Sequence, residues 1–217
     1  KLTQIASEVV RAGYQPAAHA IGDAANHAAL LGLGKIQGKA PGIFPRIEHA
    51  QIVTPADAAA FGKAGLVASV QPMHMADDHA WTPTRLGPDR VDRAFPWRTF
   101  TQGGAKLVFG SDAPIADANP FLAMAAAETR QDARGNPTGG FLPEHRLTRE
   151  ETIRAYTLAT AQVLGRKKMG VIKTGAVADL LWVQAPITTL NPTELRQLKP
   201  GRMWVNGVPI AANETPQ

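Results

Sequence analysis

The 217-residue chain contains no cysteine. This absence excludes disulfide bonds and thiolate chemistry, so histidine and carboxylate side chains remain as candidate metal ligands. The chain also lacks a run of about eighteen apolar residues, the least that a membrane-spanning helix needs, so we expect no contact with a membrane. The net charge is +5, but the basic residues are scattered and form no block. A nucleic-acid partner is therefore not expected.

No signal-peptide pattern is found at the start of the chain. The sequence begins with Lys1 rather than methionine, which indicates a processed or partial chain. A leader would have been lost with the missing start. The sequence therefore favours a soluble protein but leaves the compartment open between the cytoplasm and export.

The first part of the chain alternates between strand and helix patterns. Strands are predicted within residues 14–21, 44–50, 66–72 and 105–114, with helical patterns between them. Such alternation is typical of parallel βα units. A long polar loop is predicted from Met73 to about Asp89, followed by a helical pattern over residues 90–104. The clearest helix covers residues 147–165, where Thr148 and Glu151 form a capping-box pattern.

The character of the sequence changes near residue 168. Short strand patterns separated by turns follow, and Asn206-Gly207 is a hairpin signal. We therefore predict an α/β unit over residues 1–168 and a small β appendage over residues 169–217.

Three ionisable residues each stand at the end of a predicted strand. His19 ends the first strand, His49 the second and Asp112 the fourth. Because a βα unit takes roughly 30 residues, their spacing places all three at the carboxyl edge of neighbouring parallel strands. Imidazoles and a carboxylate that converge there suit a zinc-type hydrolytic site. Taken singly, each residue has a plainer interpretation, as a hydrogen-bonded structural histidine or a turn-capping aspartate.

Four motifs in order resemble the amidohydrolase superfamily, in its YtcJ-like, amidohydrolase-3 branch. They are "HAIGDAA", "RIEHAQ", "SVQPMHMADD" and "FGSDAPI", and the later "MGVIKTGAVADLLWV" and "WVNGVPI" are also similar to that branch. The resemblance covers nearly the whole chain. It implies a (β/α)8 barrel with a β-sandwich built from both chain ends. It also implies hydrolysis of amide or related C–N bonds with one or two divalent metal ions.

The resemblance implies a role for each strand-end residue. His19 matches the metal ligand of strand five, and His49 matches the ligand of strand six. Asp112 matches the strand-eight aspartate, which binds metal and takes a proton from the attacking water. The family's His-x-His pair of strand one has no counterpart here, nor does its bridging Lys or Glu. We therefore expect a partial (β/α)8 barrel, made of strands five to eight with their helices.

The predicted loop after the third strand supplies candidates for substrate binding. His74 lies in a "QPxH" motif, with Asp77 close behind it. Long loops of this kind are often lids or binding loops. The alternative interpretation is a solvated polar surface loop. For Glu48 we expect a side chain opposite to that of His49, directed toward the helices and paired with a basic residue there.

The sequence predicts a metal-dependent hydrolase that acts on C–N bonds of a small amide-type substrate, with a divalent metal, zinc being the first candidate. The alternative is a catalytically incomplete fragment that folds as a half barrel. Its open sheet edges would pair with a second copy of the chain or with a missing N-terminal half. A nucleotide-binding doubly wound domain is a weaker interpretation, because no glycine-rich phosphate motif follows a strand.

Overall fold

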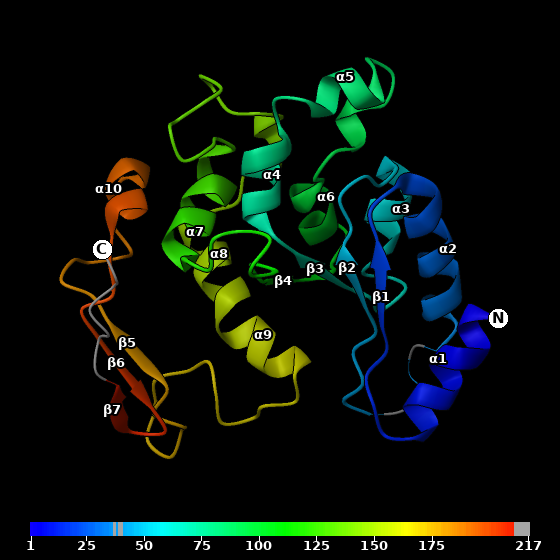
Figure 1. The fold of residues 1–217 in the computed structure, drawn as a ribbon. Coiled ribbons are helices and arrows are strands. Elements are labelled where there is room, and N and C mark those ends of the chain that lie inside the picture. The colour runs from blue at the N-terminus through cyan, green and yellow to red at the C-terminus, as the bar shows by residue number, and fades with distance from the viewer. Residues whose placement is uncertain (37, 39–40, 211–217) are drawn as a thin grey trace.

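A four-stranded parallel sheet lies at the centre of the protein (Figure 1). A computed structural model describes residues 1–36, 38 and 41–210. The strands run in the order β1 (Ala17–Ala20), β2 (Arg46–His49), β3 (Val67–Val70) and β4 (Lys106–Phe109). The predicted α/β class with a parallel sheet is thereby confirmed. The register aligns His19 with Glu48 and Glu48 with Ser69, so the carboxyl ends of the strands meet at one edge.

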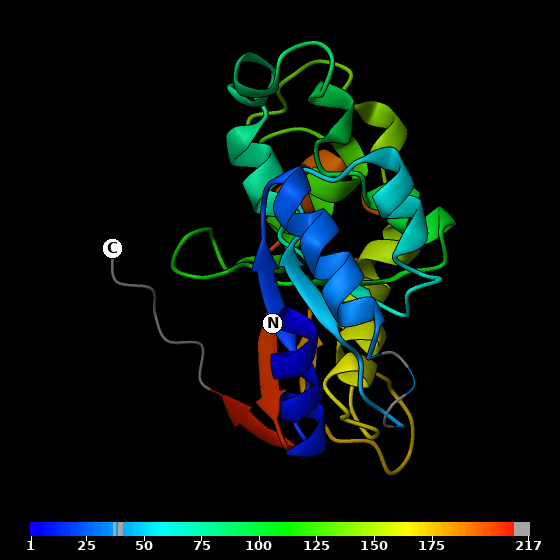
Figure 2. The same cartoon turned by 90° about the vertical axis from the view of Figure 1, so that its right-hand side faces the viewer.

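Helices precede, separate and follow the strands, and several of them bury one face of the sheet. They are α1 (Leu2–Arg11), α2 (Asp23–Gly34), α3 (Pro55–Ala60), α6 (Trp97–Gln102) and α7 (Pro120–Thr129). Figure 2 shows α2 in front of the strands, with α3 beside it. Ile47, Ala68 and Leu107 share this face and are buried against the helices. The opposite face carries the charged residues Arg46, Glu48 and Lys106 but also the buried Val67 and Val108, so it is covered only in part.

Glu48 corrects one expectation from the sequence. It lies on the open face of β2 rather than toward the helices, because Ile47 takes the buried position next to it. Glu48 does pair with a basic residue, but the partner is Arg46 two positions earlier on the same strand, with Nε 2.5 Å from Oε1. Residues two apart in a strand share a face, which explains the pairing.

Residues 73–89 are not the polar loop that the sequence predicted. They form α4 (Pro72–Asp78) and α5 (Thr82–Leu86), each with a proline in its first turn, where the missing N–H costs nothing. Met73, Met75 and Ala76 bury one side of α4. The helix expected over residues 90–104 is also shorter. A 3-10 turn, η1 (Val91–Arg93), comes first, and α6 begins after Pro96.

The helix predicted over residues 147–165 is divided in two. Its capping box of Thr148 and Glu151 is confirmed, and α8 (Arg149–Tyr156) follows it. Thr157 then leaves the helical region with φ −115° and ψ −93°, and α9 (Leu158–Val163) follows as a separate helix. The break allows α9 to bury Val163 against Val67 and Val108 of the sheet. Tertiary packing therefore overrides the continuous helical pattern.

The C-terminal segment forms the predicted small β unit. Its antiparallel strands are β5 (Leu180–Trp182), β6 (Arg202–Val205) and β7 (Val208–Ile210). Asn206 and Gly207 have positive φ values of 51° and 79°, as their hairpin requires. A further helix, α10 (Pro192–Gln197), lies beside α7 (Figure 1). The division at residue 168 stays a prediction, and residues 211–217 of the predicted appendage lie outside the described part.

No helix among the described residues has the length and apolar content that crossing a bilayer requires.

Candidate metal centre

A cavity of about 410 Å³ opens at the carboxyl edge of the parallel sheet. Its lining consists of His19, Ile21, His49, Gln51, His74, Asp77, Asp78, Asp112 and Ile115. All five site residues that were predicted from the sequence are in this set. The size is within the range of small-molecule sites.

His49 occupies the middle of a row of three imidazole rings. It ends β2, where the backbone turns through left-handed conformations at His49 (φ 74°) and Ala50 (φ 45°). Its ring lies edge-on against His19, with ring centroids 4.5 Å apart, and stacks on His74 at 5.6 Å. Left-handed backbone is uncommon outside glycine and is concentrated at functional sites. Strict strand alternation would place His49 on the face of Ile47, so the turn is what brings it to His19.

The Nδ1 atom of His49 lies 2.9 Å from the side-chain oxygen of Gln71. Gln71 is buried at the end of β3, and its amide nitrogen donates to the carbonyl oxygen of Ser69 at 3.4 Å. The ring of His49 is thus held from three sides: by two imidazoles and one amide.

His74 projects from the first turn of α4, and its side chain is 12% exposed. Burial, followed by the nearby His49, lowers the pKa of His74, while Asp112 acts in the opposite direction. The lowered pKa favours the neutral ring, which has one nitrogen lone pair to offer. Its buried Nε2 has no hydrogen-bond partner and lies 3.9 Å from Oδ2 of Asp112, too far for a hydrogen bond.

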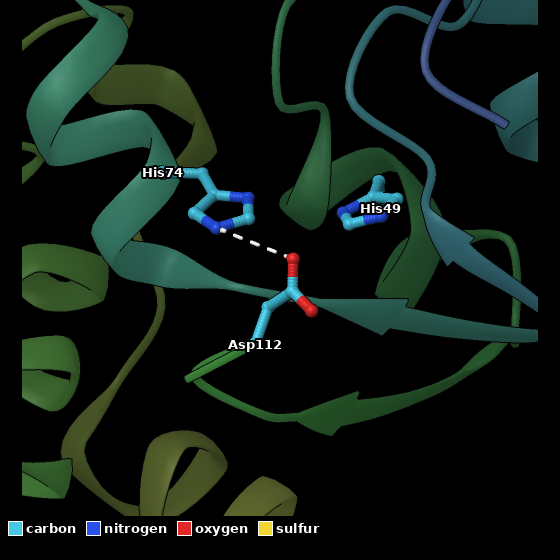
Figure 3. Close-up of side chains that lie close together, drawn as sticks. All are labelled: His49, His74 and Asp112. Atoms are coloured by element: carbon cyan, nitrogen blue, oxygen red, sulfur yellow. Dashed lines mark ion pairs between the residues drawn. The ribbon is translucent and has the colours of Figure 1, made fainter. Parts of the chain in front are cut away.

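Asp112 reaches the same point from the turn after β4. Its backbone is also left-handed, with φ 57°, and its side chain is 45% exposed. Figure 3 shows the carboxylate directed into the space between the rings of His49 and His74. One potential ligand atom from each of the three residues lies within 4.8 Å of the others.

The structure thus places His74, expected to bind substrate, beside two of the expected metal ligands. His19 lines the same cavity and touches His49, but it is not in the group of three. Asp77 lines the cavity from α4.

Three polar residues of the cavity region were missed by the sequence analysis: Gln51, Gln71 and Asp78. Gln51 donates to Asp78 at 3.2 Å, and burial raises the pKa of Asp78. The "QPMH" segment, already singled out for His74, was the available signal for Gln71. Gln51 and Asp78 lie in the quoted motifs "RIEHAQ" and "SVQPMHMADD", but their mutual contact joins distant segments and left no signal in the sequence.

The donor set suits a divalent metal ion. Two imidazoles and a carboxylate are ligands that zinc accepts, and the unpartnered Nε2 of His74 is the kind of buried atom that a ligand would satisfy.

Comparisons with known proteins agree with this geometry. A model of the amidohydrolase family matches residues 1–211. The YtcJ protein of Bacillus subtilis (strain 168) is 30% identical over 196 residues, which are 90% of this chain and 37% of that protein. The N-substituted formamide deformylase of Arthrobacter pascens is 31% identical over 117 residues, 54% of this chain and 21% of the deformylase.

A solved structure extends the comparison. An uncharacterized metal-dependent hydrolase from Pyrococcus horikoshii superposes with a TM-score of 0.67 at 29% identity, over 78% of this chain and 33% of that one. The chain therefore spans about a third or less of the length of these relatives.

Proposed function

Because the chain belongs to the amidohydrolase family, we propose that it carries part of the active site of a metal-dependent hydrolase acting on C–N bonds of amide-type substrates. The observation that carries this proposal is the convergence of His49, His74 and Asp112 from three separate segments on one cavity. The name of the related N-substituted formamide deformylase favours an amide-type substrate.

One or two divalent metal ions would be held among His19, His49, His74 and Asp112. Zinc is the first candidate, since imidazole and carboxylate are among its usual ligands. When bound, such an ion polarises a carbonyl group and makes water nucleophilic at neutral pH. His19 was predicted as a ligand from the sequence, and its contact with the ring of His49 keeps it in this set.

The protein's own groups have distinct tasks in the reaction. Asp112 accepts a proton from the attacking water and returns it to the leaving amine, so that water and amide become acid and amine. Its partly exposed carboxylate has room for this exchange. His74 and Asp77 contact the substrate from α4. Ile21 and Ile115 are exposed at the rim of the cavity and offer apolar contacts to the substituents of the amide.

We further infer that the four parallel strands are part of a (β/α)8 barrel. The support is that β1 and β4 are free edges of an open sheet, and that Ala17, His19 and Lys106 are exposed on the face that α9 covers only in part. Strands β1 and β4 would then pair with further strands, supplied by an N-terminal half or by a second copy of the chain. The alternative function is accordingly a catalytically incomplete unit that gains activity through this pairing.

Metal analysis combined with an amide-hydrolysis assay tests the proposal. The purified protein should bind a stoichiometric divalent metal and hydrolyse N-formyl or N-acyl amines, and His49→Ala should abolish both properties. His27→Ala is the matched control, because His27 is an exposed histidine on α2 paired with Asp57 outside the cavity. Metal binding without hydrolysis would favour the incomplete unit. Activity that survives in His49→Ala would refute the metal-dependent mechanism.

A further inference from the structure

The contact between His49 and Gln71 determines which nitrogen of the imidazole carries the hydrogen. The two atoms, Nδ1 of His49 and Oε1 of Gln71, are 2.9 Å apart. The orientation of the Gln71 amide is set independently, because its Nε2 donates to the carbonyl oxygen of Ser69 at 3.4 Å. The oxygen is therefore the atom that faces His49, and an amide oxygen can only accept a hydrogen bond.

We propose that Gln71 is a positioning residue that holds His49 in the tautomer with hydrogen on Nδ1 and the lone pair on Nε2. In a neutral imidazole one nitrogen donates and the other accepts, so a donor role for Nδ1 leaves Nε2 as the metal-binding atom. Buried partners of this kind fix the orientation of metal-binding histidines and raise their basicity. The expected effect of Gln71 on metal affinity rests on the proposed metal centre. The tautomer of His49 does not, because it is a property of the metal-free protein.

The location of Gln71 makes this bond a strong constraint. The residue is only 7% exposed, and a hydrogen bond is stronger in such a low-dielectric environment than in water. It also directly precedes α4, and its backbone carbonyl accepts the N–H of His74 at 3.0 Å. Gln71 thus acts on two candidate ligands. Its side chain sets the tautomer of His49, and its backbone carbonyl positions His74.

The tautomer can be measured in the wild-type protein without metal. Nitrogen-15 NMR of the histidine rings at pH 8.5, above the ordinary imidazole pKa of about 6.5, distinguishes a protonated Nδ1 from a protonated Nε2. The His49 signals are identified by their loss in His49→Asn. We expect hydrogen on Nδ1. Hydrogen on Nε2 of wild-type His49 would overturn the proposal, whatever the variants show.

Two substitutions of Gln71 separate positioning from packing. Gln71→Met keeps the length of the side chain but removes the acceptor, so the His49 signals should shift toward a mixture of tautomers. Zinc affinity, measured by competition with a chromophoric chelator, should fall by about 10- to 100-fold. Gln71→Glu keeps an acceptor and should retain both the tautomer and the zinc affinity. Equal loss of affinity in both variants, with the tautomer unchanged, would show a merely structural role.

Gln51→Met is the matched control. Gln51 is a second buried glutamine of the same cavity, 8% exposed, but it bonds to Asp78 instead of a histidine. The same substitution there should leave the tautomer of His49 unchanged. The wild-type protein could carry the hydrogen of His49 on Nδ1 and yet bind no zinc. This result would refute the proposed function, but the role of Gln71 in setting the tautomer would still hold.

Discussion

His49 ends β2 and Asp112 lies in the turn after β4, yet both adopt the left-handed backbone conformation, with φ values of 74° and 57°. Non-glycine residues rarely adopt it, because the Cβ atom crowds the backbone, at a cost of roughly 1–2 kcal/mol. Both turns direct an ionisable side chain into the same cavity. The fold therefore accepts local strain at the two positions where the candidate ligands converge.

The strain at Asp112 predicts an unusual order of stability among its variants. Asp112→Gly should be more stable than Asp112→Ala by about 1 kcal/mol, because glycine adopts a positive φ without steric cost. Urea denaturation measures the difference. Both variants should lose metal binding equally, since both lack the carboxylate. An alanine variant as stable as the glycine variant would contradict the presence of strain at this position.

The grouping of ligand atoms predicts unequal roles for two histidines. His74→Ala should weaken zinc binding more than His19→Ala does, because His74, and not His19, has a ligand atom within 4.8 Å of those of His49 and Asp112. Titration against a competing chelator gives both affinities. The reverse order would favour the set of His19, His49 and Asp112 that the family resemblance implies.

The bidentate pair of Arg98 and Glu151 predicts a loss of stability in acid. Its N–O distances are 2.6 and 3.0 Å, and it joins α6 to α8. Burial alone would raise the pKa of Glu151, but the bonds from Arg98 and from the backbone of Thr148 lower the pKa below its ordinary value. The pair therefore stabilises the fold above the unfolded-state pKa of about 4.3, and this contribution is lost as the pH falls through the lower folded-state pKa.

Glu151→Gln should remove this part of the acid dependence and cost about 1 kcal/mol or less at pH 7, since both partners are partly exposed. Thermal melts between pH 7 and pH 3 measure both the acid dependence and the loss of stability at pH 7. Glu150→Gln, at the exposed neighbouring position, should keep the wild-type pH profile.

The buried side chain of Arg130 predicts a large loss of stability when it is replaced. Its fully buried guanidinium lies over the ring of Trp97 and donates to the backbone carbonyls of Phe95 and Phe141. Burial lowers its pKa to about 9, so it keeps its charge at neutral pH. Arg130→Met should lower the free energy of unfolding by about 3 kcal/mol, because two buried carbonyls lose their donors. Arg134→Met, at an exposed position of the following loop, should change it by less than about 0.5 kcal/mol.

Much of the fold followed from local patterns. The alternation of strands and helices, the capping box of Thr148 and the hairpin at Asn206 were read from the sequence, because each depends on neighbouring residues. The break at Thr157 was not, since it depends on Val163 reaching the sheet. Residues 73–89 looked polar, but Pro72 and Pro83 lie in the first turns of α4 and α5. The methionines of α4 are buried, which only its packing reveals.

The candidate site was predictable from the sequence to a similar extent. Residue types and strand-end spacing brought His19, His49 and Asp112 to one edge. The position of His74 beside Asp112 depends on how α4 packs, and the left-handed turn at His49 left no signal in the sequence. Sequence patterns thus brought five residues to one cavity, whereas the grouping of His74 with His49 and Asp112, and the contacts of Gln51, Gln71 and Asp78, required tertiary structure.

The contact between α10 and α7 has a consequence for how the chain melts. Leu195 of α10 is completely buried against Phe121 and Met124 of α7, although it belongs to the C-terminal segment. Arg196 strengthens the junction by donating to Thr129. The two segments should therefore unfold cooperatively, in a single calorimetric transition. Removal of everything after residue 168 would uncover an apolar strip on α7 and should make the remaining chain aggregate on heating.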